Sequence, residues 1–233
     1  VGTFIEKERL HFSMDRVEHK GFNDLVSYVD KEAEQQCVSR LQEIFPEAGF
    51  ITEEGTNTTQ GETYNWVIDP LDGTANYSRD IPICCVSISL IIDLEPVMGV
   101  IYDFNNDDLY EGTKENKALI NNEPINVSDI AEKNKGILVT GLPNATNYSD
   151  KAMLMMVKDF QSWRKVRMIG SAAMAAVYVA SGKADLYKEF GTYLWDVAAG
   201  AAIVTAAGGI AEINNQKDNY QVDVSFSNSK ILE

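Results

Sequence analysis

The most constraining feature of the sequence is a short apolar run that leads directly into a turn rich in aspartate. Residues 66–68 are Trp, Val and Ile, and residues 69–74 read Asp-Pro-Leu-Asp-Gly-Thr. An apolar run bounded by turn residues is typical of a buried strand, and the Asp-Gly-Thr at its end is typical of a helix start. A strand that ends in carboxylates and opens a helix brings acidic side chains next to backbone N–H groups. The segment therefore predicts a place that can hold metal and phosphate together.

Four acidic side chains suit such a site. Asp69 and Asp72 lie three residues apart on the turn, so both can face one site, while Glu53 ends a neighbouring strand and Asp196 begins a helix. Mg²⁺ takes hard oxygen ligands, and two ions about 4 Å apart can clamp an attacking water and a leaving oxygen. Each residue also has a simpler explanation on its own. Asp196 is typical of a helix cap, and Glu53 with Glu54 is typical of a solvated loop, so the sequence leaves both interpretations open.

Composition argues against several classes of protein. The 233 residues carry a net charge of −15 without a basic stripe, which argues against nonspecific binding of nucleic acid. The chain is 45% hydrophobic, but no apolar run reaches the roughly 18 residues that span a bilayer, so we expect no membrane partner. No signal peptide is visible, and Cys37, Cys84 and Cys85 make an odd count, so we expect a reducing, cytoplasmic location.

Residues 1–7 have a helical pattern without a cap, and we expect the chain to begin inside a helix.

The apolar spacing divides the chain into two halves. Residues 22–44 repeat their apolar positions with a period near 3.6, which predicts one long helix beginning near Asn23. Strands and hairpins follow, so we predict an α+β half over residues 1–128, and alternating strands and helices predict an α/β half over residues 129–233. The helix predicted over residues 151–163 is rich in methionine, which we expect to fill gaps in the core. Further predicted elements are a hairpin over residues 83–102, strands at 137–140 and 184–187, and helices over 171–181 and 196–207.

Six segments, taken together, resemble the inositol monophosphatase family. They are residues 23–30, 50–54, 66–74, 170–173, 189–191 and 195–200. The third and the last, WVIDPLDGT and WDVAAG, resemble the two signature motifs of that family, and all six stand in the family's order. The resemblance runs from about residue 20 to residue 209. It implies an α/β (α+β) fold, a layered α-β-α-β-α sandwich of the sugar phosphatase type, usually dimeric. Residues 114–118 depart from the pattern, because they lack the glycines expected in that hairpin.

By this resemblance, acidic residues and one carbonyl look like ligands for two to three Mg²⁺ ions. They are Glu53, Asp69, the carbonyl of Leu71, Asp72 and Asp196, with Asp69 shared between two ions and Glu53 also facing a weaker third. Thr74, together with Asp30, looks like the residue that orients and deprotonates the attacking water. Such a pair is chemically reasonable, because a threonine hydroxyl can relay a proton to the carboxylate that holds it.

The resemblance also implies which residues contact the substrate or support the ligands. The implied substrate contacts are Asp72, Gly73, Thr74, Ser171, Ala172 and Glu189. Among them, Glu189 matches a glutamate that contacts sugar hydroxyls, although a surface loop charge is its simpler explanation. Glu54 is the implied orienting residue behind the ligands, and Lys20 corresponds to a lysine near the site.

The sequence leaves the identity of the phosphate ester open. Ala75 stands where branches that hydrolyse nucleotide 3′-phosphates usually have lysine and where a histidinol-phosphate branch usually has arginine. With Glu189, it favours hydrolysis of inositol 1-phosphate or a similar polyol or sugar phosphate. The family resemblance implies in addition a homodimer that is sensitive to lithium. The alternatives are a sugar bisphosphatase of the fructose-1,6 type, a nucleotide bisphosphate 3′-phosphatase and a catalytically silent binding protein. The intact set of acidic residues argues against the last.

Overall fold

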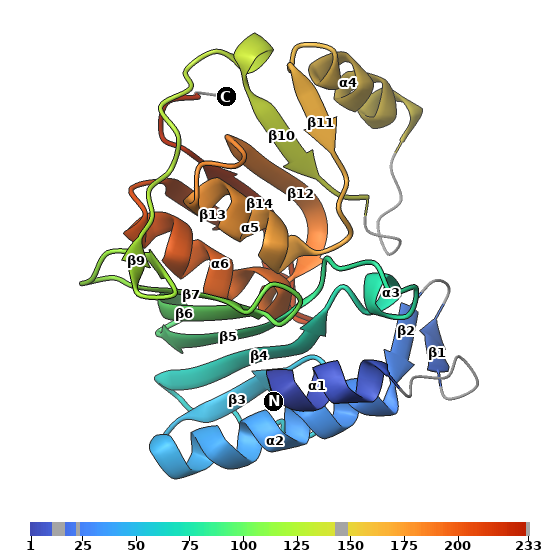
Figure 1. Cartoon of the computed structure of the whole chain (residues 1–233), viewed down its shortest axis with the longest axis vertical. Coiled ribbons are helices and arrows are strands. Elements are labelled where there is room, and N and C mark those ends of the chain that lie inside the picture. Colours follow the sequence, from blue (N-terminus) through green and yellow to red (C-terminus); the bar gives the residue numbers. More distant parts are fainter. Residues whose placement is uncertain (11–16, 22–23, 143–148, 232–233) are drawn as a thin grey trace.

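Two large β-sheets, with helices between and outside them, and a small two-stranded sheet make up the described part of the protein (Figure 1). The computed structural model describes residues 1–10, 17–21, 24–142 and 149–231, and of residues 17–21 and 24–27 it describes the backbone alone. The side chain of Lys20 therefore lies outside the described residues, and its predicted role stays a prediction. None of the helices described is both long and apolar enough to cross a membrane.

The first sheet has seven strands, and helices α1 (Gly2–Arg9) and α2 (Tyr28–Ile44) lie along its outer face (Figure 1). Its strands in spatial order are β3 (Gly49–Thr52), β4 (Tyr64–Asp72), β5 (Cys85–Ile92), β6 (Glu95–Asp103), β7 (Asp108–Thr113), β8 (Leu119–Ile120) and β9 (Glu123–Pro124). β3 and β4 are parallel, and the remaining pairs are antiparallel. The short helix α3 (Thr74–Tyr77) follows β4 after one residue. The parallel pair brings the ends of β3 and β4 to the same edge of the sheet.

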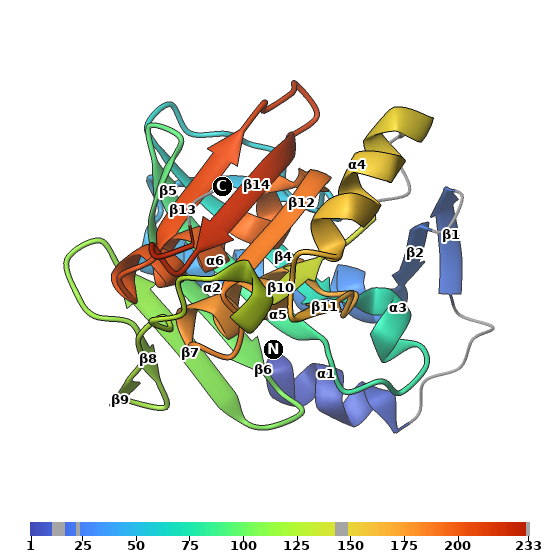
Figure 2. The ribbon, with the colours of Figure 1, turned by 90° about the horizontal axis from the view of Figure 1, so that it is seen from above.

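The second sheet has five strands and completes the layers. In spatial order they are β11 (Lys165–Arg167), β10 (Ile137–Thr140), β12 (Leu186–Tyr193), β14 (Gln221–Ser227) and β13 (Ile210–Asn214). Helices α5 (Ala172–Ala180) and α6 (Leu194–Ala206) lie between the two sheets, and α4 (Asp150–Phe160) lies beside β10 and β12 (Figures 1 and 2). Phe160 packs with Leu138 and Leu186. The predicted α-β-α-β-α sandwich is confirmed.

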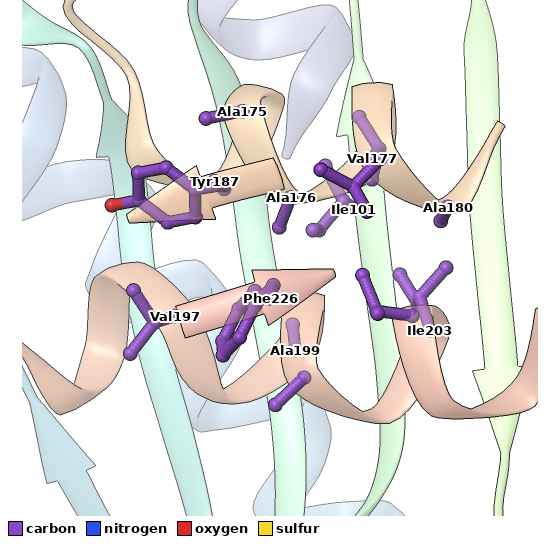
Figure 3. Close-up of a cluster of buried hydrophobic side chains, with 14 of the residues drawn as sticks. Ile101, Ala175, Ala176, Val177, Ala180, Tyr187, Val197, Ala199, Ile203 and Phe226 are labelled. Atoms are coloured by element: carbon purple, nitrogen blue, oxygen red, sulfur yellow. The ribbon is translucent and has the colours of Figure 1, made fainter. Parts of the chain in front are cut away.

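The two central helices approach each other closely because small residues face one another. A Cβ added at Gly200 of α6 would lie 2.3 Å from the Cβ of Ala176 on α5. Figure 3 shows Ala176, Ala199 and Phe226 gathered in this layer. The same buried cluster takes Ile101 from the first sheet, so its members come from both sides of the predicted division at residues 128 and 129. That division into two halves stays a prediction.

Most predicted elements are confirmed, but the start of the long helix is wrong. The hairpin over residues 83–102 is β5 with β6, and the helices over 171–181 and 196–207 are α5 and α6. The helix predicted over residues 22–44 begins only at Tyr28, because β2 (Asp24–Ser27) pairs in antiparallel fashion with β1 (Val17–Gly21). The apolar period cannot reveal that another strand takes up these backbone hydrogen bonds.

The expectation that the methionines of residues 151–163 fill the core is also wrong. No residue of α4 is buried, and Met155 is 62% exposed. Met153 is exposed as well, and Met156 is partly buried. The helix is amphipathic and starts with a side-chain cap from Ser149, so its local signals are those of an ordinary helix. Its apolar residues nevertheless lie largely on the surface.

The close approach of α5 and α6 gives a prediction for stability. Gly200→Ala would stabilise an open helix by about 1 kcal/mol. Here the added methyl overlaps Ala176, so we expect the free energy of unfolding to fall by about 1–3 kcal/mol, measured by urea denaturation. Thr205→Ala, at an exposed position of the same helix, is the control and should stay within about 0.5 kcal/mol. A stabilised Gly200→Ala protein would contradict the packing described.

Candidate active site

One cavity of about 310 Å³ gathers nearly all of the predicted site residues. It lies where the end of β4, the start of α5, the end of β12 and the start of α6 meet. The predicted residues that line it are Glu53, Asp69, Leu71, Asp72, Gly73, Thr74, Ser171, Ala172, Glu189 and Asp196. Glu53 and Asp196, which are more than 140 positions apart in the sequence, thus line the same cavity. The spacing of the motifs alone cannot show this.

Asp69 lies at the centre of a cluster of negative charge. It is 2% exposed, and its Oδ1 accepts a hydrogen bond of 2.9 Å from the backbone N–H of Leu71. Burial raises the pKa of Asp69 well above its usual range, and the charges of Glu53, Asp72 and Asp196 raise it further. A buried group of carboxylates with this much repulsion is stabilised by a bound cation.

Asp72 is held by the start of α5. Its Oδ2 accepts hydrogen bonds from the Ser171 hydroxyl and, at 2.7 Å, from the backbone N–H of Ala173, while the N–H of Ala172 lies 3.3 Å from Oδ1. Burial raises the pKa of Asp72 to about 6, although these hydrogen bonds lower it. The N-terminal end of a helix carries partial positive charge, so α5 favours the carboxylate form. Ser171 and Ala172 therefore both line the cavity and fix this aspartate.

Asp196 combines the two interpretations that the sequence left open. Its Oδ2 accepts hydrogen bonds from the hydroxyl of Thr192 at 2.6 Å and from the backbone N–H of Tyr193 at 2.9 Å, as a residue in the first turn of α6 would. The same residue lines the cavity and adds to the repulsion on Asp69. Capping and a place in the acidic cluster are thus compatible.

Thr74 connects the cavity to a buried carboxylate behind it. Its hydroxyl lies 3.0 Å from Oδ1 of Asp30 and 3.1 Å from the carbonyl oxygen of Leu71. Asp30 lies on α2 and is 1% exposed, and it is absent from the cavity lining. Only a residue that contacts both sides can relay a proton between them, and Thr74 has that position.

The oxygen donors fit Mg²⁺. Within the part of the chain that the structure describes, no three histidine, cysteine or acidic side chains enclose a metal ion by themselves. Catalytic Mg²⁺ keeps several waters and shares its coordination with substrate phosphate, so it needs an open set of oxygens and no closed cage. The carboxylates of Glu53, Asp69, Asp72 and Asp196 together with the carbonyl of Leu71 are such a set, and the cavity leaves room for water and phosphate.

Glu189 also lines the cavity. Its Oε2 accepts a hydrogen bond of 2.9 Å from the hydroxyl of Tyr187. Burial raises the pKa of Glu189 to about 7, although the bond from Tyr187 lowers it. Ala75, at the rim, is exposed and offers no polar group from its side chain. Glu54 does not line the cavity, and its predicted orienting role stays a prediction.

The sequence reasoning missed Glu34, which is fully buried on α2. Its carboxylate accepts hydrogen bonds from the backbone N–H of Glu54 at 2.7 Å and from the N–H and hydroxyl of Thr56 at 2.8 and 2.7 Å. Glu34 therefore fixes the turn that carries Glu53. A signal was present, because Asp30 and Glu34 are four residues apart and lie on one helix face. Also missed were the lining residues Thr140, Gly141, Leu142 and Ile169.

Comparison with known proteins gives a consistent result. The model of the inositol monophosphatase family matches residues 1–230. Inositol monophosphatase 3 of Solanum lycopersicum is 38% identical over 212 residues, which cover 85% of this chain and 76% of that protein. A protein of Aquifex aeolicus named fructose-1,6-bisphosphatase/inositol-1-monophosphatase is 36% identical over 197 residues, 84% of this chain and 75% of its own length. The crystal structure of the extragenic suppressor protein suhB from Bartonella henselae has a TM-score of 0.88 at 27% identity, with 98% of this chain and 90% of that chain covered.

The anchoring of the Glu53 turn gives a second prediction. Glu34→Gln replaces a carboxylate oxygen with an amide that repels the N–H groups it faces. We expect the free energy of unfolding to fall by about 1–3 kcal/mol, measured by chemical denaturation. Glu32→Gln removes the same charge from the exposed face of α2 and is the control. An equal effect of both changes would show that charge alone, and not the anchoring, matters.

Proposed function

The chain belongs to the inositol monophosphatase family, whose members are phosphatases, and we propose that it hydrolyses the phosphate monoester of a small polyol or sugar in this cavity. Inositol 1-phosphate is the leading substrate. The observation that carries the proposal is the hydrogen bond from Thr74 to buried Asp30, made in the cavity that also holds the acidic cluster.

The metal-binding part of the proposal follows from the oxygen donors. Glu53, Asp69, the carbonyl of Leu71, Asp72 and Asp196 would hold two to three Mg²⁺ ions. Bound Mg²⁺ supplies charge neutralisation and a lowered pKa of water. The protein's part is to hold each oxygen in place: the N–H of Leu71 holds Asp69, the start of α5 holds Asp72, and Thr192 holds Asp196.

The proton relay is the chemical role of Thr74 and Asp30. The Thr74 hydroxyl donates to Oδ1 of Asp30, which leaves its oxygen lone pairs to accept a hydrogen bond from the attacking water. As that water attacks the phosphorus, the bond from phosphorus to the ester oxygen breaks, the water's proton passes to the Thr74 oxygen and the hydroxyl proton passes to Asp30. The departing alkoxide takes a proton from solvent and leaves as the alcohol. Asp30 is shielded from solvent, so the proton stays close to the reacting group.

Glu189 and Ala75 select the alcohol part of the substrate in this proposal. The carboxylate of Glu189 can accept hydrogen bonds from ring hydroxyls, and the methyl side chain of Ala75 leaves the rim open. A fructose-1,6-type bisphosphatase is the second candidate, because the relative from Aquifex aeolicus carries both names. A nucleotide 3′-phosphatase is disfavoured by Ala75, which provides no cation for a second phosphate. The homodimeric state, the lithium sensitivity and the cytoplasmic location rest on the family resemblance and are parts of the proposal.

Removal of the metal gives a third prediction. Chelation should abolish hydrolysis, and added Mg²⁺ should restore it. Asp69→Asn should abolish turnover, yet the metal-free variant should melt at the same temperature as the wild type or higher, because one source of repulsion is gone. Scanning calorimetry with and without Mg²⁺ measures both effects, and the rise in melting temperature caused by Mg²⁺ should shrink in the variant.

Asp218→Asn, at an exposed position, is the control for loss of one negative charge and should keep full activity. Full hydrolysis in excess chelator would contradict the metal-dependent reaction. A large loss of metal-free stability in Asp69→Asn would mean that the carboxylate is needed for folding.

The different roles proposed for Thr74, which serves the reaction, and for Glu189, which selects the substrate, give a fourth prediction. Thr74→Ala should lower kcat/KM by about 10²–10⁴-fold for inositol 1-phosphate and for an aryl phosphate alike, because both need the same water. Glu189→Gln should cost about 1–3 kcal/mol in kcat/KM for inositol 1-phosphate and have little effect on the aryl phosphate, which has no hydroxyls to bind. Steady-state kinetics on the two substrates measure the contrast. Equal losses of kcat/KM on both substrates in Glu189→Gln would show that Glu189 supports the catalytic step and does not select the substrate.

A further inference from the structure

The side chain of Glu189 is held by a buried tyrosine on its own strand. Tyr187 and Glu189 are two residues apart on β12, so both point to the same face of the sheet. Tyr187 is fully buried, and its ring packs edge-on against Phe226 at 5.7 Å between centroids, as Figure 3 shows for the surrounding cluster. Its hydroxyl donates to Oε2 of Glu189 at 2.9 Å.

The other side of the Glu189 carboxylate lies against bare backbone. β10 runs parallel to β12, with Thr140 opposite Lys188, so Gly141 lies next to Glu189. A Cβ added at Gly141 would lie 2.4 Å from both carboxylate oxygens of Glu189. The hydroxyl of Thr140 donates to the carbonyl oxygen of Lys188 at 2.6 Å and ties the two strand ends together. Only a glycine at this position leaves the space that the carboxylate fills.

The hydrogen bond to Glu189 explains why a hydroxyl is buried at Tyr187, and packing alone does not. Phenylalanine would fill the same space in the cluster of Val139, Val222 and Phe226 without bringing a polar atom into it. A hydroxyl buried among apolar side chains costs free energy unless it has a partner. Here its partner is a carboxylate that lines the cavity. The bond also lowers the pKa of Glu189 against the effect of burial, which favours the charged form that accepts hydrogen bonds best.

We propose that Tyr187 and Gly141 are positioning residues that clamp the Glu189 carboxylate in one orientation, and that this clamp sets the preference for hydroxylated phosphate esters over plain ones. The inference rests on the proposed function and assigns its selectivity to two further residues. One oxygen of Glu189 accepts the hydrogen bond from Tyr187, and the absence of a side chain at Gly141 leaves the space for this orientation, so the carboxylate is ordered before the substrate arrives. Such ordering raises affinity, because less conformational freedom is lost on binding.

A double-mutant cycle on the Mg²⁺-loaded enzyme tests the clamp. Tyr187→Phe should lower kcat/KM for inositol 1-phosphate by about five- to twentyfold, mainly through KM, and change the value for an aryl phosphate less than about twofold. In the Glu189→Ala background the same change should cost less than about twofold, because the acceptor of the Tyr187 hydroxyl has been removed. Tyr110→Phe is the matched control: Tyr110 is also buried, but its hydroxyl contacts Lys183.

Gly141→Ala tests the second half of the clamp. The added methyl displaces the Glu189 carboxylate, so we expect at least about a tenfold loss of kcat/KM for inositol 1-phosphate and a much smaller loss for the aryl phosphate. Tyr187→Phe keeps its ring packing, so the proposal is still tested if Gly141→Ala folds poorly.

Equal losses on the two substrates, or an undiminished effect of Tyr187→Phe in the Glu189→Ala background, would overturn the clamp. Crystal structures of the wild type and Tyr187→Phe give a readout that needs no activity. A Glu189 side chain that turns away from Gly141 in the variant supports the clamp, and one that does not move overturns it. Absence of hydrolysis of both substrates by the Mg²⁺-loaded wild type would overturn the proposed function, and the two structures would still decide the clamp.

Discussion

The repulsion between carboxylates in one cavity is the constraint on which the rest of the structure depends. Asp69 and Asp72 are buried, and Asp196 adds its charge a short way off. Buried anions are costly unless hydrogen bonds or a cation offset the lost hydration. Each carboxylate accordingly receives its own donors: a turn N–H from Leu71, the first N–H groups of α5, and the hydroxyl of Thr192. The carboxylates of the cluster therefore repel one another, and a bound divalent cation would offset this repulsion.

These donors come from both sheets and from the helices between them, so the site needs the whole layered packing. The start of α5 reaches Asp72 at the end of β4 through the N–H of Ala173, and α5 itself packs closely against α6, where Ala176 lies opposite Gly200. On the outer side, α2 places Asp30 behind Thr74 and Glu34 behind the turn of Glu53. A shift of any layer by one side chain's width would separate a donor from its acceptor. This dependence explains why small residues are concentrated in the two central helices.

How far the sequence predicts this arrangement depends on whether the signal is local. The strand, turn and helix around Asp69 could be predicted because the pattern lies in nine consecutive residues, and the family resemblance then brought the distant Asp196 and Glu189 to the same site. The strand β2 was missed because its hydrogen-bonding partner, β1, cannot be read from its own apolar spacing. Glu34 was missed because its donors belong to another segment. Gly141 carries no side chain, so its importance appears only when the neighbouring strand places a carboxylate against it.

The proposed mechanism assigns the proton relay and the selection of the substrate to different parts of the fold, and this has a consequence for how such a site can change. Thr74 and Asp30 lie on helices α3 and α2, whereas Glu189 and Tyr187 lie on β12 of the second sheet and Gly141 directly follows β10. A substitution at Gly141 alters the wall that faces the alcohol without moving the oxygen donors of β4. A substitution in the acidic cluster has a wider effect, because the charges of Glu53, Asp72 and Asp196 all act on Asp69 and raise its pKa. Differences in substrate among proteins with this arrangement are therefore expected at Glu189 and Gly141, beside the second sheet, and at Ala75 on α3, where a change in one side chain leaves the acidic residues in place.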